Sequence, residues 1–207
     1  MRALLSLLLA FLLAGCAVGR TAGYSEASVN VPMVAASNVT LALAVQDRRP
    51  YVVSGNKPEK FVGLQRGGFG NPFDVNTSSG AAVASDLRDS IAKGFKAKGY
   101  SVTPVTVAPG DDSDTLKRKL AEPRAKRAAL VVLNELKSDS YMNSSVAYNM
   151  TLTVLDERGS VVASNSVKGE DNVSGSGMIA DESKITQAVA NKLEQLFADP
   201  RIGAALR

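Results

Sequence analysis

Three consecutive strands are predicted by residues 128–167, which read AALVVLNELKSDSYMNSSVAYNMTLTVLDERGSVVASNSV. Residues 128–136 are almost entirely apolar, which is typical of a central strand buried on both faces. Residues 146–155 alternate between apolar and polar side chains with a period of two, as a half-buried strand does. The link Asp156-Glu157-Arg158-Gly159 predicts a hairpin turn into a third strand over residues 161–167. A sheet is therefore expected at the centre of the fold.

Two long helices are predicted on either side of these strands, over residues 80–98 and 182–197. In each, apolar side chains recur at helical spacing, so one face is apolar and the other is charged. Asp199-Pro200 ends the second helix and leaves a short tail. The apolar faces are formed by Val83, Leu87, Ile91 and Phe95 in the first helix and by Ile185, Val189, Leu193 and Leu196 in the second.

The remaining elements are shorter. Residues 38–45 alternate like a half-buried strand, and residues 101–107 predict another strand, which Pro104 places at a sheet edge. A short helix is expected over residues 111–120, with Pro123 as its stop. The resulting fold class is α+β: a single domain with a mixed, largely antiparallel sheet, helices on one face and the order β-α-β-α-β-β-β-α.

Residues 46–79 lack a long element, apart from a short edge strand expected over residues 61–65. Aromatic and basic side chains are interleaved here, and this pattern suits contact with an anionic or glycan ligand. The simpler interpretation is that the aromatic rings fix the loop to the core while the basic side chains stay in water. The candidate contact residues are Tyr51, Phe61, Arg66, Phe69 and Phe73.

The composition excludes several kinds of site. The chain has 207 residues with no His, no Trp and one Cys, and its formal net charge is +4. Histidine-based catalysis, cysteine metal sites and disulfide frameworks are therefore excluded, and we expect no catalytic residues, no metal ion and no cofactor. Asp86 and Asp89 are candidates for acid–base chemistry by carboxylates alone, although their expected place on the charged face of a helix favours simple solvation.

A cluster of basic residues lies in segment 117–127. Such a cluster suits contact with lipid head groups, lipopolysaccharide or the carboxylates of peptidoglycan. The alternative is an ordinary basic helix end and loop on the protein surface, which is the commoner situation. The residues concerned are Lys117, Arg118, Lys119, Arg124, Lys126 and Arg127.

A short apolar segment stands at the beginning of the sequence. Met1 and Arg2 precede an uncharged run over residues 3–14, which is shorter than the roughly 20 residues of a membrane-spanning helix. This pattern is typical of the hydrophobic region of a secretory signal peptide. The run ends in Leu13-Ala14-Gly15-Cys16, so the only cysteine directly follows small and apolar residues.

These four residues resemble the lipobox of bacterial lipoproteins. The resemblance implies cleavage after Gly15, a diacylglycerol thioether on Cys16 and acylation of its new amino group, typically with palmitate. It also implies an outer-membrane address, because lipoproteins retained in the inner membrane carry Asp where this chain has Ala17. An ordinary signal peptide with a chance cysteine is the alternative. The expected organisation is a signal peptide over 1–15, a lipidated N-terminus and flexible tether over 16–37, and a periplasmic domain over 38–207.

A second resemblance covers nearly all of the expected mature chain. Its motifs are Val39-Thr40-Leu41, Asp86-Leu87-Arg88, Lys98-Gly99-Tyr100 and Val146-Ala147-Tyr148-Asn149. With these motifs, its length and its final helix, the chain resembles the YajG-type family of bacterial lipoproteins. The resemblance implies a lipoprotein of no established activity, so it supplies no catalytic residues.

We therefore expect a non-enzymatic, lipid-anchored protein that faces the periplasm and serves as a binding or assembly accessory. Its expected partners are the membrane, through the N-terminal lipid, and an envelope protein or peptidoglycan. A periplasmic location argues against nucleic acid as a partner. Contact with peptidoglycan or lipopolysaccharide through the basic segment is the alternative function, and a hydrolase that uses only carboxylates is a more remote one.

Overall fold

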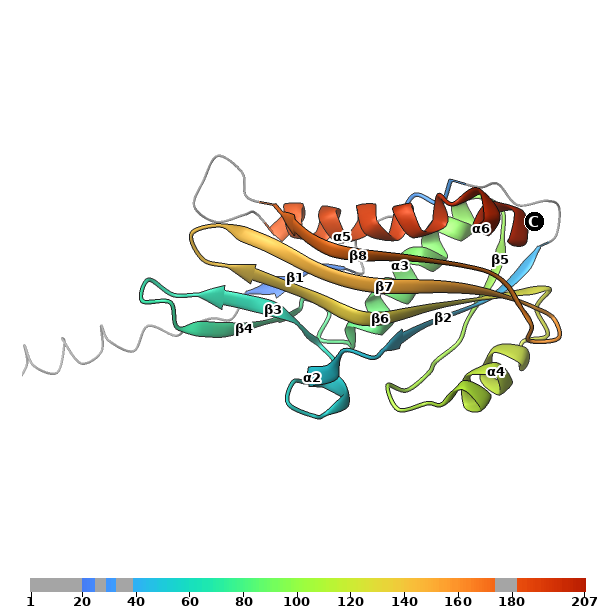
Figure 1. Cartoon of the computed structure of the whole chain (residues 1–207), viewed down its shortest axis with the longest axis horizontal. Helices are drawn as coiled ribbons and strands as arrows, with labels where there is room; N and C mark the ends of the chain where they lie inside the picture. The colour runs from blue at the N-terminus through green and yellow to red at the C-terminus, as the bar shows by residue number, and fades with distance from the viewer. Residues whose placement is uncertain (1–19, 25–28, 33–38, 174–181) are drawn as a thin grey trace, which may run out of the picture.

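The computed structural model describes residues 20–24, 29–32, 39–173 and 182–207 (Figure 1). These residues form one mixed sheet of eight strands with helices packed on it, which confirms the α+β class. The strands are β1 (Thr21–Ala22), β2 (Thr40–Asp47), β3 (Phe61–Arg66), β4 (Pro72–Thr77), β5 (Ser101–Pro104), β6 (Arg127–Ser140), β7 (Ser144–Asp156) and β8 (Val161–Asn172). The helices are α2 (Pro50–Val53), α3 (Val83–Ala97), α4 (Ser113–Ala121), α5 (Glu182–Phe197) and α6 (Pro200–Ala205).

The long strand β6 is the centre of the sheet. One of its edges pairs antiparallel with β7 along almost its whole length, and β7 pairs antiparallel with β8. Its other edge is shared by two strands, because β2 pairs in parallel with the first half of β6 and β3 with its last residues. The predicted central strand and the predicted hairpin are therefore confirmed.

The stretch over residues 46–79 contains more structure than the sequence indicated, namely α2 and the antiparallel hairpin of β3 and β4. Strand β3 lies between β4 and β6, so the expected edge position of residues 61–65 was wrong. Gly63 permits this close pairing, since a Cβ atom there would overlap Ser138 of β6. Among the described strands β5 pairs only with β2, which places Pro104 at a sheet edge as predicted.

The larger core lies between one face of the sheet and helices α3, α5 and α6. The apolar faces predicted for the two long helices are buried in it. Phe95 of α3 contacts Phe197 at the end of α5, with ring centroids 5.2 Å apart in edge-to-face geometry. The expected tail is in fact α6, because Pro200 starts a new helix and the Asp199 carboxylate accepts a hydrogen bond from the Arg201 N–H.

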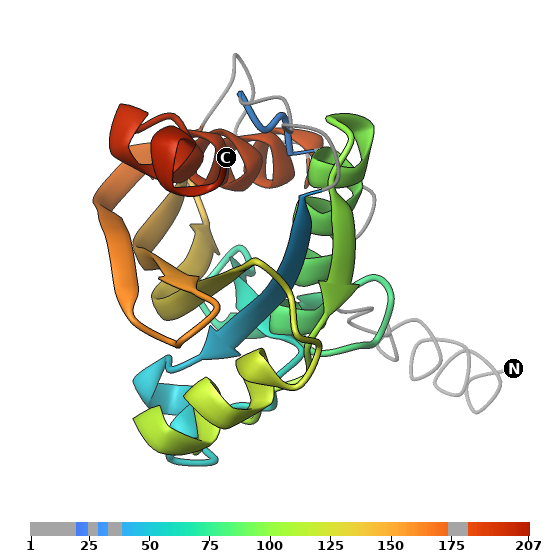
Figure 2. The same cartoon turned by 90° about the vertical axis from the view of Figure 1, so that its right-hand side faces the viewer.

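Helix α4 covers the opposite face of the sheet, which departs from the single helical face that was expected. Figure 2 shows α4 on one side of the sheet and α5 and α6 on the other. Leu116 and Leu120 of α4 pack in a smaller core with Ala42 and Ala44 of β2. Strand β2 is therefore buried on both faces. Its alternation separates larger side chains in one core from alanines in the other, and not a core face from a solvent face.

Part of the expected tether belongs to the folded domain. Strand β1 pairs in parallel with β4, and Tyr24, Val29 and Val31 are buried in the larger core. A two-residue strand and isolated apolar side chains carry no periodicity, so the sequence pattern did not reveal this packing. The described domain begins at Arg20, and the expected tether over 16–37 does not extend over residues 20–24 and 29–32.

The sheet is elongated along β6, which gives the molecule two distinct ends (Figure 1). One end carries the β3–β4 turn (residues 67–71) beside the β6–β7 turn (residues 141–143), and we call these two turns the hairpin tips. The other, the charged end, carries α4, the β7–β8 turn and the C-terminus. At about 3.3 Å per residue, β6 separates the two ends by about 40 Å.

Candidate functional site

The expected lipidation residue Cys16 and the expected sorting residue Ala17 lie outside the described residues. The described chain begins four positions later, at Arg20, whose carbonyl accepts a hydrogen bond from the Asn76 N–H of β4 (3.3 Å). The first described residue therefore lies beside β4.

The basic segment 117–127 does not form one continuous cationic surface. Lys119 forms an ion pair with Asp111 (Nζ–Oδ2 2.6 Å), and the Arg127 Nε donates a hydrogen bond to the Ala205 carbonyl (2.7 Å). The bond from Lys119, helped by the Ala108 N–H, holds the pKa of Asp111 below its usual range. The four side chains left exposed are Lys117, Arg118, Arg124 and Lys126.

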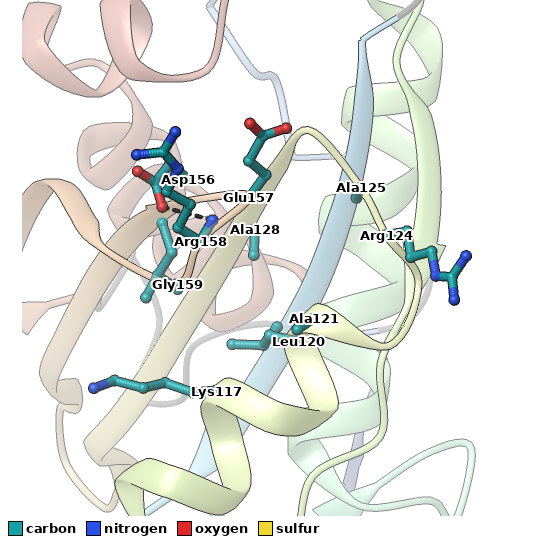
Figure 3. A pocket seen from close by; sticks show the side chains of 11 residues that line it. Lys117, Leu120, Ala121, Arg124, Ala125, Ala128, Asp156, Glu157, Arg158 and Gly159 are labelled. Atoms are coloured by element: carbon teal, nitrogen blue, oxygen red, sulfur yellow. Dashed lines mark hydrogen bonds between the residues drawn. The ribbon is translucent and has the colours of Figure 1, made fainter.

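A pocket of about 390 Å³ lies at the charged end, between α4 and the β7–β8 turn (Figure 3). We call it the charged-end pocket. Figure 3 shows Lys117 and Arg124 reaching outward on opposite sides of it. Its volume falls in the range of small-molecule and side-chain binding pockets. It is lined by Lys117, Leu120, Ala121, Arg124, Ala125, Ala128, Leu155, Asp156, Glu157, Arg158 and Gly159.

The β7–β8 turn gives this pocket a fixed wall with an acidic component. The Asp156 carboxylate accepts hydrogen bonds from the backbone N–H groups of Arg158 (2.9 Å) and Ser160 (2.8 Å). Gly159 has a φ of 77°, a left-handed conformation that glycine adopts without strain. Because the wall carries Asp156 and Glu157 opposite the basic residues of α4, the pocket has mixed charge. It suits a partner with both apolar and polar groups better than a polyanion.

Two of the candidate contact residues in the loop, Tyr51 and Phe61, serve the interior instead. Their rings meet edge to face at a centroid distance of 5.5 Å, and Phe61 is buried. The Tyr51 hydroxyl donates to Glu135 Oε1 (2.7 Å) and to the Leu136 carbonyl (3.1 Å) of β6. Burial raises the pKa of Tyr51. These two side chains therefore fix the loop to the sheet, as the simpler interpretation predicted for the aromatic rings.

A fully buried arginine, Arg49, fills a gap along one edge of β6. The gap lies between the residues of β6 that pair with β2 and those that pair with β3. The Arg49 guanidinium donates to both oxygens of Asp47 (Nε–Oδ1 2.8 Å, Nη2–Oδ2 2.6 Å). Its other N–H groups donate to the carbonyls of Phe61 (2.6 Å), Leu136 (3.1 Å) and Glu59 (3.3 Å). All five donors of the guanidinium are thereby satisfied. The side chain thus replaces the strand pairing that β6 lacks at this point.

The electrostatics of this buried pair favour its charged form. Burial alone would lower the pKa of Arg49, but the hydrogen bonds to Asp47 and its negative charge outweigh burial and raise it. The Arg49 guanidinium also lies over the Tyr51 ring, 5.4 Å from its centroid. We call Asp47, Arg49 and Tyr51 the Arg49 node. Its polar groups hold the segment between β2 and β3, which contains α2, against β6.

The other candidate contact residues, Arg66, Phe69 and Phe73, lie at or next to the hairpin tips. Phe69 and Phe73 are exposed. Arg66 forms a two-bond ion pair with Asp139 of β6 (Nε–Oδ1 2.8 Å, Nη2–Oδ2 2.6 Å). The five candidates are therefore divided between the Arg49 node and the hairpin tips, and they form no single ligand site.

The Arg66–Asp139 pair gives a pH prediction. Hydrogen bonds from Arg66 hold the pKa of Asp139 below its usual range. A carboxyl group whose pKa is lowered in the folded state stabilises that state at pH values above its ordinary pKa of about 3.9. This stabilisation is lost as the pH falls through the lowered pKa. We expect Arg66→Gln to move the Asp139 midpoint back upward in a titration followed by carboxyl-carbon NMR.

A matched control is Lys57→Gln, because Lys57 pairs with a different carboxylate, that of Asp74, at 2.6 Å. The Asp139 midpoint should stay in place in this variant. An unchanged midpoint in Arg66→Gln would contradict the assignment of the pKa shift to Arg66.

The two carboxylates considered for acid–base chemistry have different surroundings. Asp89 is exposed, as expected, and pairs with Arg88 at 3.0 Å. Asp86 is buried, which corrects its expected place on the charged face of the helix. Its two oxygens share the hydrogen bond that the Ser79 hydroxyl donates (2.9 and 2.7 Å), and burial raises its pKa despite this bond. Asp86 thus ties the start of α3 to the preceding turn.

Within the ranges that the structure describes, no group of three or more His, Cys, Asp or Glu side chains is placed to hold a metal ion. The helices in the same part of the chain are too short or too polar to span a bilayer.

No protein-family model matches the chain, and no curated protein sequence matches it. Its fold is similar to that of a Xanthomonas campestris protein assigned to family DUF330, with a TM-score of 0.51 and 14% identity over 90% of this chain and 93% of that one. An uncharacterised protein has a TM-score of 0.50 and 9% identity over 91% and 99%. A lipoprotein from Neisseria meningitidis also matches, with a TM-score of 0.37 and 15% identity over 76% and 99%. At these identities the first two likenesses show a shared fold.

The sequence patterns did not reveal the Arg49 node or the second turn of the hairpin tips, residues 141–143. A signal for the node was present, because Asp47 and Arg49 continue the alternation of Leu41, Leu43 and Val45 and so point to the same face. Opposite charges two residues apart on an inward face indicate a buried pair. Tyr141 and Met142 gave no such signal, since a turn between two strands has no period.

Proposed function

We propose that this protein is a non-enzymatic, lipid-anchored component of a bacterial cell envelope that acts as a binding or assembly accessory. The stretch Leu13-Ala14-Gly15-Cys16 carries the proposal, because it places the only cysteine of the chain after an apolar run. The first described residue, Arg20, follows Cys16 by four positions, so lipid on Cys16 would hold the domain close to a membrane surface. Ala17 favours the outer membrane, with the domain in the periplasm.

The charged-end pocket is the proposed contact site for a partner. It combines an apolar floor, which includes Leu120 and Leu155, with charged side chains of both signs around it. An envelope protein that inserts an apolar side chain between the charges fits this arrangement. Peptidoglycan or lipopolysaccharide is the second candidate, because Lys117, Arg118, Arg124 and Lys126 stay exposed near the pocket.

The buried polar groups of the domain support a binding role over a hydrolytic one. Asp47 and Arg49 neutralise each other and satisfy backbone carbonyls, while Asp86 is held by Ser79. These groups, which would be the first candidates for acid–base chemistry by burial, are engaged in structural contacts. A hydrolase that uses only carboxylates therefore has less support from the structure.

The substitution Cys16→Ser tests the anchor. We expect the parent protein to partition into the detergent phase and its N-terminal peptide to carry diacylglycerol and a fatty acid by mass spectrometry. The variant should lose both properties, because serine lacks the thiol that takes the lipid. Ala17→Asp is the matched control, since it should keep the lipid and move the protein to the inner membrane.

Cross-linking in cells then tests the accessory role. We expect one dominant envelope protein to co-purify with the parent and to be reduced in Cys16→Ser. An unmodified N-terminal peptide in the parent would refute the lipid anchor. Recovery of glycan or lipid alone would favour the alternative function, contact with peptidoglycan or lipopolysaccharide through the basic segment.

A further inference from the structure

The hairpin tips expose large apolar side chains to solvent. Phe69 is 99% exposed and Met142 68% exposed, and Phe73 and Tyr141 are 41% and 40% exposed. The Tyr141 hydroxyl donates to the Gly68 carbonyl (3.3 Å), so the two turns lie against each other. A group of exposed apolar side chains on one end of a domain marks a surface that contacts a partner or a membrane.

The hairpin tips themselves carry no charged side chain, and Glu170 of β8, which lies beside them, is exposed to water. Residues 67–71 read GGFGN and residues 141–143 read YMN, all of them uncharged. The nearest charges in these strands are Arg66, one residue before the first turn, and Asp139, two residues before the second, and they neutralise each other in an ion pair of 2.6 Å. Burial of an unpaired charge would be costly, and this arrangement avoids it.

The direction of strand β1 allows an anchor at the same end. Strand β1 is parallel to β4, with Thr21 beside Asn76 and Ala22 beside Thr77, while β4 begins at Pro72 next to the tips. Strand β1 therefore runs away from the hairpin tips, and Thr21 is its end nearer to them. Four residues span at most about 14 Å, so Cys16 can reach the level of the tips but not the charged end about 40 Å away.

We propose that the hairpin tips insert into the lipid membrane that anchors Cys16, with Phe69, Tyr141 and Met142 in the interface. This inference rests on the proposed lipid anchor. Aromatic side chains favour the membrane–water interface, and such insertion typically reaches about 5–10 Å into the head-group and acyl boundary. The domain then stands end-on, and the charged-end pocket faces away from the membrane toward the periplasm.

Tryptophan fluorescence provides the test, because the chain has no Trp of its own. Phe69→Trp places a single probe at the tips, and its side chain is so exposed that the exchange should not disturb folding. Val162→Trp is the matched control, since Val162 is 48% exposed on β8 near the charged end. The protein purified from its host membranes is reconstituted into vesicles of phosphatidylethanolamine and phosphatidylglycerol, with and without lipids that carry a quenching doxyl group.

We expect the emission of Phe69→Trp to shift to shorter wavelength in vesicles and to be quenched by the doxyl lipids, whereas Val162→Trp keeps the emission of a probe in water. Two unquenched probes would overturn the proposal. Quenching of both would overturn the end-on orientation. A shift of Phe69→Trp that depends on protein concentration without vesicles would instead assign the tips to contact between copies of the chain.

The failure of the anchor and the failure of the tips can be told apart. The mass of the N-terminal peptide reports lipidation separately. If this peptide is unmodified, the Cys16 thiol is coupled to vesicles that contain a maleimide-bearing lipid, and the same two probes are compared. Insertion of the tips is then supported or overturned although the proposed anchor has failed.

Discussion

Replacing Arg49 with alanine is expected to lower the free energy of unfolding by about 3–5 kcal/mol, the usual cost of breaking a buried ion pair from one side. The truncation leaves the Asp47 carboxylate buried without its partner. It also removes the donors that serve the carbonyls of Phe61, Leu136 and Glu59. The segment that contains α2 then loses the guanidinium's bond to the Leu136 carbonyl of β6.

Urea unfolding, followed by circular dichroism, measures this loss. Arg48→Ala is the matched control: Arg48 is exposed and its guanidinium donates a long hydrogen bond to the Pro109 carbonyl (3.3 Å), so we expect a change within about 0.5 kcal/mol. Arg49→Lys keeps the charge but not the two-pronged geometry, and it should be clearly destabilised as well. Equal stability of Arg49→Ala and Arg48→Ala would show that the node does not hold the fold.

Replacing Gly94 with alanine is expected to destabilise the domain by about 1–3 kcal/mol through overpacking. Gly94 lies in α3, and a Cβ atom there would overlap the carbonyl oxygen of Val29 and come within 3.1 Å of the Val31 side chain. The overlap with backbone cannot be relieved by a rotamer change. The segment that contains Val29 and Val31 must therefore move off the helix.

The control for this variant is Gly203→Ala in helix α6, where an added Cβ atom has nothing within 4 Å. Alanine is the better helix former, so this exchange should stabilise the domain by about 0.5–1 kcal/mol. Urea unfolding gives both values, and limited proteolysis near residues 29–32 reports whether the segment has detached. A stabilised Gly94→Ala variant would contradict the packing of this segment on α3.

The sequence predicted the elements that carry a clear period. The alternation in residues 146–155 and the helical spacing in residues 182–197 each depend on one face meeting a core, and both elements lie where expected. Prediction failed where the period was short or mixed. Strands β3 and β4 are six residues each and are interrupted by glycine and by charged side chains, so their pairing with β6 and β1 is decided by long-range contacts.

The candidate site was less predictable than the fold. Pairing of Lys119 with Asp111 and of Arg127 with the Ala205 carbonyl decides which basic side chains remain free, and both partners are set by tertiary structure. The hairpin tips consist of two turns that are far apart in sequence. One contains the candidate contact residue Phe69, and the other contains Met142. Their proximity follows from the pairing of β3 with β6, which no local pattern encodes.

The position of β6 also has a consequence for the order of folding. Strand β2 pairs with β6 through contacts such as Leu41 with Arg127. Because β6 is synthesised much later than β2, this pairing cannot form until then. Until then β2 has only the short edge strand β5 beside it. Contacts so distant along the chain are associated with slow folding, because a long loop must close before they form. A chain with this topology cannot complete its sheet before β6, which ends at Ser140, has been synthesised.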